Sequence, residues 1–400
     1  MADKQMLDVI FIGGGLAAGL AAILLRQRMP HLNFLVIEAR EDLTFPQTWS
    51  FQSLPHGIDP TLLKVFSEVE SSWLNDFISK SWPCYEVRFP DLKKTLNIPY
   101  HSIRSTDFWT YLKRELGEHL LLGATVKDVT GTAVTLVNGA SFTATQLIDT
   151  RGWADKAFPV AGYQKFIGLN LQLKKPHGLL HPILMDATVP QVDGFRFMYT
   201  LPWDERSLLI EDTHYSNTRD IDVALYRQAI LDYAQTRGWD VESIGDMEHG
   251  ALALPSFSKS RRFAPAPCQG VPQMGTRGGL FHATTGYSIY DAVLGAEQIL
   301  HKAEQGWAQC STELKSYGQK RWAGQEFYRR LNNMLFFAAI PGERYRILER
   351  FYAHDEDLIS RFYAGKTNTS DKLRILSGKP PIAVRPALYH FFKRSEVQHG

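Results

Sequence analysis

The chain has 400 residues, of which 44% are hydrophobic and 22% are charged. These values are typical of a folded globular protein, they exclude a disordered chain, and the length suits two or three domains. The formal net charge is only +2, which gives no reason to expect a nucleic-acid partner. The three cysteines, Cys84, Cys268 and Cys310, lie far apart and outside any CxxC motif. We therefore expect neither disulfides nor a metal site.

Charge is distributed unevenly along the chain. Residues 301–400 hold 17 Lys and Arg against 10 Asp and Glu, whereas the first 300 residues have an acidic excess. This basic, aromatic-rich quarter fits contact with an anionic membrane surface, and a solvated helical face explains it equally well. Residues 9–25 are uncharged but contain four glycines and precede a second strand, so they are not interpreted as a targeting segment. No run reaches the roughly 20 apolar residues of a spanning helix, and we expect a soluble or peripheral protein.

The first forty residues contain a dinucleotide-binding pattern. Residues 7–12 predict a buried strand, residues 20–28 a helix and residues 32–37 a second strand, with a glycine-rich turn at 13–19. An acidic residue, Glu38, ends the second strand. Strand, G-x-G-x-x-G/A, helix, strand and acid, in this order, are the fingerprint of a Rossmann-like unit.

Each position of the pattern has a physical role. Gly13 permits the tight turn, Gly15 lets the backbone approach a pyrophosphate, and Ala18 or Gly19 lets the helix pack closely on the strand. The N-terminus of the helix offers free N–H groups to the phosphates. Glu38 is placed to accept hydrogen bonds from ribose hydroxyls, which favours FAD or NAD over NADP.

The remaining elements follow in chain order. Ser105 is predicted to cap a helix over residues 107–117, and residues 123–149 alternate like a small antiparallel meander. Residues 165–255 are rich in predicted strands, the clearest at 166–173, 195–201 and 208–212. From residue 292 to about 375 the pattern is helical.

Residues 278–288 are expected to return the chain to the nucleotide-binding unit. They are predicted to form a strand that leads through a small-residue loop, Thr284 to Ser288, into a helix. Such a loop can bring backbone N–H groups against flavin phosphate or ring atoms. Together with the N-terminal fingerprint, it favours FAD over NAD.

Several segments resemble the bacterial lycopene β-cyclases, and together they span nearly the whole chain. The most specific are the Ile-Glu-Asp-Thr-His-Tyr stretch at 210–215 and the tail segments at 361–366 and 373–381; others lie at 48–51, 85–90, 176–179, 185–188 and 284–288. The chain departs from the family in four places. Gly14 makes the turn a triple glycine, Ala18 replaces a third glycine, which the fingerprint tolerates, Gln47 stands where His is expected, and Thr150 stands where Gly is usual.

The resemblance implies a non-redox isomerisation that closes the linear ends of lycopene into β-rings and gives β-carotene through γ-carotene. A proton adds to the terminal double bond, the neighbouring alkene attacks the resulting cation, and a ring proton is lost. Reduced FAD is the implied cofactor and NADPH the implied external reductant. The resemblance also adds Asp149, Thr285, Gly286 and Tyr287 to the expected cofactor contacts. Implied partners are the two carotenoids and a membrane surface, with no obligate protein partner.

Glu211 and Asp212 are the candidate catalytic residues. Glu211 is the proposed acid, because a carboxyl buried among Leu208, Leu209 and Ile210 has a raised pKa. Side chains alternate along a strand, so only one of the two acids faces the pocket. The other is structural and pairs with Arg196 or His214. An exposed strand acid is the alternative for Glu211, and a structural histidine is the favoured interpretation of His214.

The predicted fold is α/β, with a Rossmann-like FAD-binding domain, an inserted β-rich substrate domain and a helical C-terminal region. The FAD-binding domain is predicted at 1–70, 100–165 and 270–310, the substrate-facing domain at 71–99 and 166–269, and the helical region at 311–400. The protein is expected in the cytoplasm, bound to the inner face of the cell membrane. Aromatic residues at 321–364 form either a tunnel wall or interfacial anchor, or plain helical core.

Two other functions remain open. A redox flavoenzyme, such as a FAD monooxygenase or polyprenyl reductase, would consume NAD(P)H stoichiometrically with a lipophilic substrate. A non-catalytic carotenoid- or lipid-binding flavoprotein would bind the pigment without changing it. Loss of activity in Glu211→Gln, with flavin and carotenoid binding intact, would count against the second.

Overall fold

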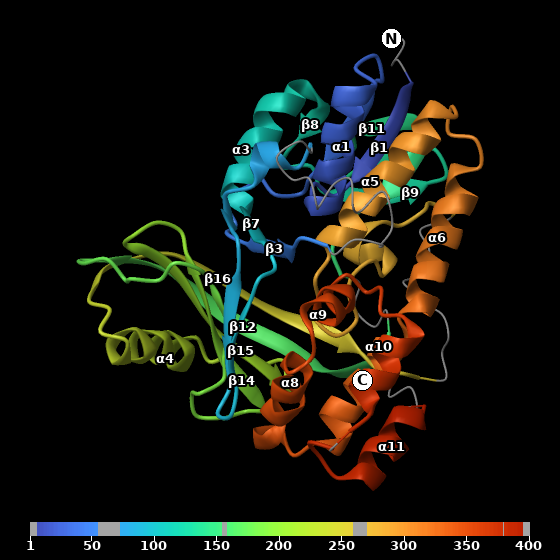
Figure 1. The fold of residues 1–400 in the computed structure, drawn as a ribbon. Coiled ribbons are helices and arrows are strands. Elements are labelled where there is room, and N and C mark those ends of the chain that lie inside the picture. The colour runs from blue at the N-terminus through green and yellow to red at the C-terminus, as the bar shows by residue number, and fades with distance from the viewer. Residues whose placement is uncertain (1–5, 55–72, 154–157, 259–269, 379, 395–400) are drawn as a thin grey trace.

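The computed structural model describes residues 6–54, 73–153, 158–258, 270–378 and 380–394. Cys268 and Lys379, which belong to features of the sequence discussed above, lie outside these ranges. The described elements form three sheets, with helices around the N-terminal sheet and a helical C-terminal part (Figure 1). This arrangement confirms the predicted α/β fold with a helical C-terminal region.

The N-terminal sheet has six strands in the order β8-β2-β1-β11-β10-β9. Its strands are β1 (Leu7–Ile12), β2 (Phe34–Ile37), β8 (Leu120–Leu121), β9 (Val126–Thr130), β10 (Ala133–Leu136) and β11 (Ser141–Asp149). β8, β2, β1 and β11 are parallel neighbours, whereas β11, β10 and β9 form the predicted antiparallel meander. β1 and β2 are short apolar runs buried on both faces, as expected of parallel strands covered by helices.

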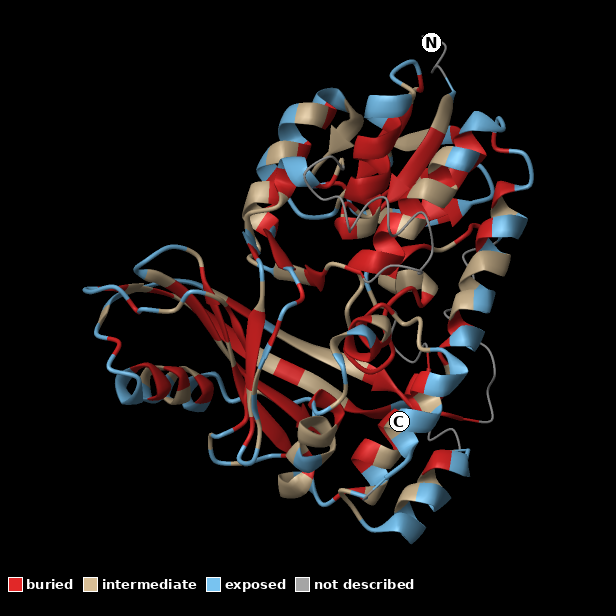
Figure 2. Cartoon of the chain, viewed as in Figure 1, coloured by how far each residue is buried: buried red, intermediate tan, exposed pale blue. Residues whose placement is uncertain are grey.

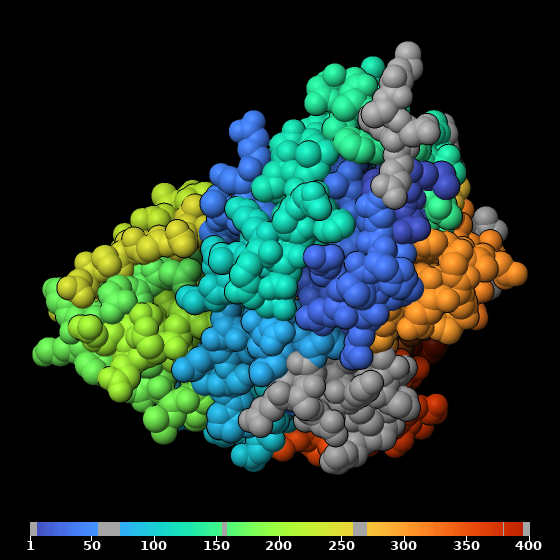
Figure 3. Space-filling model, turned by 90° about the horizontal axis from the view of Figure 1, so that it is seen from above, coloured from blue at the N-terminus to red at the C-terminus, as the bar shows by residue number. Residues whose placement is uncertain are grey.

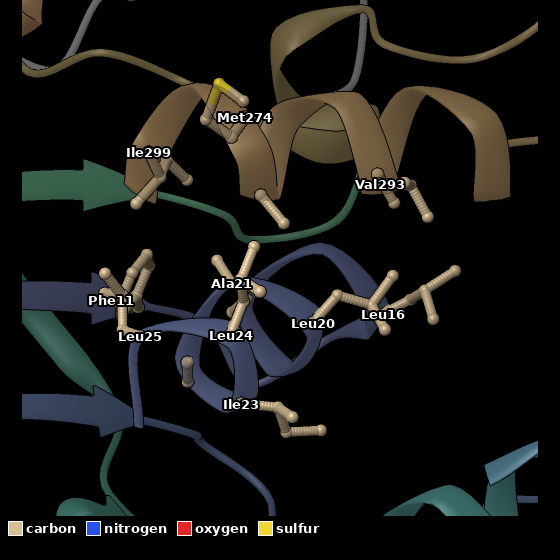
Figure 4. Packing of buried hydrophobic residues seen from close by; sticks show 14 of the residues in the cluster. Phe11, Leu16, Leu20, Ala21, Ile23, Leu24, Leu25, Met274, Val293 and Ile299 are labelled. Atoms are coloured by element: carbon tan, nitrogen blue, oxygen red, sulfur yellow. The ribbon is translucent and has the colours of Figure 1, made fainter. Parts of the chain in front are cut away.

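Helices α1 (Leu16–Arg28), α3 (Ser105–Leu116) and α5 (Ile289–Glu304) surround this sheet. α1 is rich in Ala and Leu, is buried from Leu16 to Leu25 apart from Ala17, and packs beside α5 (Figure 4). Leu20, Ala21 and Leu24 belong to the same buried cluster as Val293 and Met274. Of the two small residues that the fingerprint assigns to close packing, Ala18 is fully buried, whereas Gly19 lies against Phe108 of α3, where an added Cβ would lie 2.6 Å from the ring.

The predicted cap at Ser105 is wrong. Arg104 occupies the N-cap position of α3 and its side chain makes no capping hydrogen bond. Ser105 is fully buried; its hydroxyl donates to the Phe45 carbonyl at 2.9 Å and accepts from the Gln47 N–H at 2.8 Å. The serine therefore ties a distant loop to the start of the helix, an interaction that no local pattern indicates.

The second sheet has seven strands in the order β16-β12-β15-β14-β13-β5-β6. Its strands are β5 (Tyr85–Arg88), β6 (Lys93–Leu96), β12 (Val160–Leu173), β13 (Ile183–Asp186), β14 (Phe195–Pro202), β15 (Ser207–Ser216) and β16 (Val241–Pro255). The long strand β12 is paired antiparallel with β15 on one side and with the edge strand β16 on the other. α4 (Val223–Thr236) covers one face of the sheet, through contacts of Tyr226 and Ile230 with Ile210 and its neighbours.

A three-stranded antiparallel sheet joins the two larger ones. It consists of β3 (Thr48–Gln52), β7 (Tyr100–Arg104) and β4 (Lys80–Trp82). β3 and β7 lie between the N-terminal sheet and the seven-stranded sheet (Figure 1). Seen from above, the seven-stranded sheet and α4 extend to one side of the N-terminal unit, and the α5–α6 region lies on the other (Figure 3).

The C-terminal part is helical, as predicted. Its helices are α6 (Cys310–Gly324), α7 (Glu326–Asn333), α8 (Tyr345–Tyr352), α9 (Glu356–Tyr363), α10 (Thr369–Leu376) and α11 (Val384–Phe392). Short helical turns occur at η2 (Asn75–Phe77), η3 (Gly117–His119), η4 (Gly275–Gly278), η5 (Met334–Ala338) and η6 (Pro341–Glu343). Most aromatic residues of the 321–364 stripe are buried (Figure 2), including Tyr328, Tyr352 and Tyr363. Tyr328 and Tyr352 fit the core interpretation, whereas Tyr363 also lines a cavity and fits that of a tunnel wall.

The strand predicted within residues 278–288 does not form. Apart from the end of η4, these residues are turn and loop up to the start of α5. Leu280 and Phe281 are buried, but Phe281 packs in a small cluster with Phe158 and Trp322 rather than in a sheet. A short apolar run therefore misled the prediction, since loop residues can be buried without pairing. The predicted domain boundaries remain a prediction.

Gly162 of β12 gives a test of how the C-terminal part packs on the sheet. The ring of Phe336 in η5 lies so close to Gly162 that an added Cβ would overlap it. We expect Gly162→Ala to lower the free energy of unfolding by about 1–3 kcal/mol through overpacking. Urea denaturation measures this as a lower midpoint.

Gly131→Ala is the matched control, because a Cβ at Gly131 would meet no heavy atom within 4 Å. Equal midpoints for the two variants would show that Phe336 is not held against β12.

Candidate active site

A cavity of about 520 Å³ extends from the N-terminal sheet to the seven-stranded sheet. Gly13, Gly15 and Glu38 line its nucleotide-binding end, and Glu211 lines the other end. Thr285, Gly286 and Tyr287 of the loop before α5 line it as well. The structure therefore brings most of the predicted cofactor and catalytic residues around one space.

The glycine-rich turn leaves room for a phosphate group in front of α1. Gly13 has a φ of 102°, and a Cβ there would lie 2.9 Å from the Arg151 backbone, so only glycine fits this turn. A Cβ on Gly15 would meet no heavy atom within 4 Å. The N-terminus of α1 thus faces open space, with Leu16 and Ala17 also lining the cavity. This arrangement fits a dinucleotide pyrophosphate.

Glu38 is held in place by backbone donors. Its Oε2 accepts a hydrogen bond from the Gly14 N–H at 2.7 Å, and its Oε1 accepts one from the Arg40 N–H at 3.0 Å. Because the carboxylate lines the cavity directly after β2, its position fits ribose binding. The structure thus brings Glu38 and the glycine turn together.

Ala18 and Asp149 are not among the residues that line the cavity. Ala18 is fully buried in the packed face of α1. Asp149 is fully buried at the end of β11, where its carboxylate binds Arg151 at 2.8 Å and Arg277 at 3.3 Å. Both side chains therefore pack within the walls of the site and do not face the cofactor space. For Asp149 this differs from the expected cofactor contact.

The loop before α5 is shaped by a buried histidine. Burial lowers the pKa of His282 to about 3, so the ring is neutral and Nδ1 can accept hydrogen bonds. It accepts them from the N–H groups of Thr284 and Thr285, both at 3.2 Å. Gly286 has a φ of 72°, which favours glycine. These hydrogen bonds hold the loop so that residues 285–287 line the cavity. The backbone N–H groups of this loop and of the glycine-rich turn together fit FAD.

Two glutamates meet across strand β12 at the other end of the cavity. Glu211 of β15 and Glu248 of β16 are both paired with Gly168 of β12. A Cβ on Gly168 would lie 2.8 Å from Glu211 Cγ and 2.9 Å from Glu248 Cγ. Because Gly168 lacks a side chain, the two carboxyl groups can reach each other and form a hydrogen bond.

The pair favours a protonated Glu211. Burial, the negative charge of Glu248 and the hydrogen bond to Glu248 raise the pKa of Glu211 well above its usual value. Burial also raises the pKa of Glu248, whose Oε1 accepts a hydrogen bond from the Thr48 hydroxyl at 3.0 Å. Two buried carboxyl groups in contact cannot both ionise easily, so they share one proton. We assign this proton to Glu211 and the negative charge to Glu248.

Asp212 faces the opposite side of β15. It is buried, its carboxylate accepts hydrogen bonds from Arg196 at 2.8 and 2.9 Å, and it contacts His214 Nε2 at 3.0 Å. It is not among the residues that line the cavity. The alternation of side chains thus places Glu211 toward the cavity and gives Asp212 and His214 structural contacts.

Aromatic rings and hydroxyl groups form the cavity wall near Glu211. Tyr199 is the register partner of Glu211 on β14, and its hydroxyl contacts those of Ser50 at 2.9 Å and Tyr100 at 3.1 Å. The Tyr100 hydroxyl in turn contacts that of Tyr287 at 3.0 Å. Burial raises the pKa of Tyr199, so its phenol stays neutral. Further rings line the cavity at Trp49, Trp109, Trp153, Phe166, Phe197, Tyr215 and Tyr363.

The sequence analysis missed Glu248, Thr48 and Gly168 as parts of the site. Glu248 and Gly168 come together only through the register of β12 with β16. A signal was present, because an isolated glycine in a strand pattern indicates close approach of another group. Among the described residues, no cluster of three or more His, Cys, Asp or Glu side chains could hold a metal ion.

A family model described as lycopene cyclase protein matches residues 8–389. The chain is 42% identical over 396 residues to the lycopene beta-cyclase of Pseudescherichia vulneris, covering 98% of this chain and 100% of that protein. It is 40% identical over 384 residues to the lycopene beta-cyclase of Pantoea ananas, covering 95% and 97%. A lycopene beta-cyclase from a Paracoccus species is 33% identical over 385 residues, covering 95% and 96%.

Solved structures support the fold alone. A geranylgeranyl bacteriochlorophyll reductase-like protein from Thermoplasma acidophilum has a TM-score of 0.58 at 13% identity, covering 94% of this chain and 97% of that chain. A halogenase variant in complex with FAD has a TM-score of 0.55 at 12% identity, covering 90% and 82%. The fold is therefore shared with the reductase-like protein and with the halogenase that was solved with FAD.

The ion pair of Asp212 leads to a prediction about stability and pH. Burial alone would raise the pKa of Asp212, but hydrogen bonds from His214 and Arg196 and their charges hold it below its usual value. A depressed pKa contributes stability above the unfolded pKa of about 4, and this stability is lost as pH falls through the folded pKa. We expect Asp212→Asn to cost about 3–5 kcal/mol at neutral pH, because Arg196 is left without a buried partner.

Urea denaturation at several pH values checks this expectation. The difference in unfolding midpoint between the wild type and Asp212→Asn should be largest near pH 7 and shrink below about pH 4. A difference that does not change with pH would contradict an ionised Asp212.

Proposed function

Because the chain belongs to the lycopene cyclase family, we propose that it closes the linear ends of lycopene into β-rings, with Glu211 as the acid. The product is β-carotene, formed through γ-carotene, and no atom is gained or lost overall. The observation that carries the proposal is the Glu211 carboxyl, which faces the cavity beside Glu248 and has a raised pKa. An acid that is protonated at neutral pH is what alkene protonation requires.

The protein groups around Glu211 suit each step of the reaction. The Glu211 O–H bond breaks as a C–H bond forms at the terminal alkene and leaves a tertiary cation. The neighbouring alkene attacks this cation, and a ring proton then leaves, so that its electron pair forms the ring double bond. A carboxylate of the Glu211–Glu248 pair is the base for this proton. The pair thus begins and ends each cyclisation with one shared proton.

The cavity also stabilises the positive charge on the substrate. The rings of Tyr199, Tyr215 and Phe197 line it and present electron-rich faces to a cation. While Glu211 is deprotonated, both carboxylates add negative charge close to the cation. The same rings exclude water, which would otherwise trap the cation.

Reduced FAD is the cofactor that we propose for the nucleotide end. Gly13, Gly15 and Glu38 would hold its phosphates and ribose, and residues 285–287 would contact the rest of the molecule. When bound, a reduced flavin supplies an electron-rich ring that stabilises positive charge near it. The sequence contains one nucleotide fingerprint, which we assign to FAD. We therefore propose that the reductant, NADPH, acts from outside without a fingerprint site of its own.

Replacement of Glu211 by glutamine tests the function directly. Purified protein would be incubated with lycopene in liposomes, FAD and NADPH under anaerobic conditions, and the pigments separated and weighed by mass spectrometry. We expect the wild type to form β-carotene of unchanged mass and Glu211→Gln to lose about 10²- to 10⁴-fold in rate, because the acid is gone. Flavin absorbance of the variant should be that of the wild type.

The alternatives give different results in the same assay. A product whose mass has changed by oxygen or hydrogen would favour a redox flavoenzyme and overturn the cyclase proposal. Unchanged lycopene with bound flavin would favour a carotenoid-binding protein. Full activity of Glu211→Gln would leave the cyclase function standing but remove Glu211 as the acid.

We propose that the protein reaches its substrate as a peripheral membrane protein on the cytoplasmic side of the cell membrane. Among the described residues, no helix is long and apolar enough to span a bilayer. The exposed face of α11, which we call the α11 face, carries Val384, Leu388, Tyr389 and Phe392, each 49–66% exposed. Residues 384–394 contain Arg385, Lys393 and Arg394 and no acidic residue. Apolar and basic side chains together suit an anionic lipid surface.

Two neighbouring side chains extend this surface. Phe337 of η5 is 42% exposed and its ring lies 5.8 Å from that of His390 in α11, and Ile340 is 65% exposed. The exposed Phe337 therefore differs from the buried aromatic residues of the 321–364 stripe. Figure 1 shows α11 at the end of the molecule opposite the N-terminal sheet.

Vesicle binding tests the α11 face. We expect Leu388→Asp combined with Phe392→Asp to lower binding to anionic liposomes by more than about tenfold, because each side chain loses about 1.5–3 kcal/mol of burial. Co-sedimentation with phosphatidylglycerol vesicles measures this loss. Leu180→Asp is the control, since Leu180 is 87% exposed and lies outside this face. Equal losses in both variants would argue against α11 as the contact.

A further inference from the structure

A second cavity lies next to the Glu211–Glu248 pair. It has a volume of about 290 Å³, and Glu248 and Thr48 line both this cavity and the larger one. Glu211 lines only the larger cavity. Glu248 therefore forms part of the wall between a mainly apolar site and a second space.

The second cavity is lined by polar and apolar residues in about equal share and is partly open to solvent. Asn170, Gln172 and Ser207 line it, and the exposed residues Arg104, Asp204 and Asp246 also belong to its wall. A cavity of this size can hold several water molecules where polar groups line it, since each takes about 30 Å³ and needs two to four polar partners. The side chains thus offer hydrogen-bonding groups between the surface and Glu248.

We propose that Glu248 exchanges protons between Glu211 and solvent through this second cavity, so that a solvent proton can replace the proton of the pair between cyclisations. The proposal rests on the proposed function, because it assigns the exchange route of the proton that starts each cyclisation and is returned to the pair at its end. Glu248 lies outside both the dinucleotide fingerprint and the Ile-Glu-Asp-Thr-His-Tyr stretch, so neither motif assigns this role to it. Glu248 is a proton-exchange residue here, while Glu211 is the group that protonates the alkene.

The contacts of the pair support this division of roles. Glu248 is buried, hydrogen-bonded to Glu211 and held by the Thr48 hydroxyl. The other titratable groups near Glu211 are Tyr199 of β14 and Tyr287 of the loop before α5, whose high pKa values keep them neutral. Asp212 lies on the other face of β15. Glu248 is thus the one described group near Glu211 with both a charge and access to the second cavity.

The proton balance of the step is closed. In the resting pair Glu211 holds the proton and Glu248 is a carboxylate. Glu211 gives its proton to the alkene, and the pair receives the proton that leaves the ring. Glu248 then loses a proton to water in the second cavity and takes up another, and the hydrogen bond between the two carboxyl groups passes it to Glu211. No oxidant, reductant or other reactant is needed.

Deuterium labelling tests the route. The enzyme with reduced FAD is diluted from H₂O into D₂O together with lycopene liposomes, and early β-carotene is analysed by mass spectrometry. If solvent protons recharge Glu211, the wild type should add close to one deuterium per ring. In Glu248→Gln the ring proton should stay on Glu211 and be used again, so the label should fall below half of the wild-type value. Glu242→Gln, at an exposed glutamate of the same strand, should label like the wild type.

Each outcome decides the proposal. A Glu248→Gln product with the wild-type label overturns it, whereas absence of β-carotene from the wild type itself would overturn the proposed function instead. If Glu248→Gln gives no product, Thr48→Val replaces it, because this change removes only the hydroxyl that holds the Glu248 carboxylate. A deuterium label in the Thr48→Val product below that of Glu242→Gln then supports the proposal, and an equal label overturns it.

Discussion

The active site depends on the missing side chain of Gly168. This residue lies in β12, the second strand from one edge of the seven-stranded sheet, between the strands that carry Glu211 and Glu248. Any larger residue would push its Cβ against both glutamate side chains. The contact between two buried carboxyl groups follows from this space, and the shared proton follows from the contact. A chemical property of the site, an acid that stays protonated at neutral pH, thus originates in local packing.

The fold brings this pair to the end of a cavity that begins at the nucleotide fingerprint. The N-terminal sheet contributes the turn at Gly13 and the acid Glu38, and the seven-stranded sheet contributes the carboxyl pair. The small sheet of β3, β4 and β7 connects the two, and its Thr48 bonds directly to Glu248. A cofactor site on one sheet and an acid on another can therefore share one cavity. The reductase-like protein and the FAD-bound halogenase have a similar fold, so this architecture serves several reactions.

The sequence predicted the features that depend on local pattern. The first βαβ unit, the meander, the long strands and the helical C-terminal part agree with the structure, because periodicity and glycine placement determine them. Glu211 was found through alternation along its strand and a family resemblance. Features that depend on distant pairing were missed. Glu248 meets Glu211 only through strand register. Ser105 binds a loop instead of capping α3. Asp149 forms ion pairs with two arginines instead of facing the cofactor space.

The infrared spectrum of Glu211 tests the account most directly. The difference between the wild type and Glu211→Gln at neutral pH isolates the carboxyl group of this one residue. The account predicts the C=O stretch of a protonated carboxyl, and this band should titrate at lower pH in Glu248→Gln, because the repelling charge is gone. A difference spectrum with carboxylate bands alone at neutral pH would contradict a protonated Glu211 and with it the proposed mechanism.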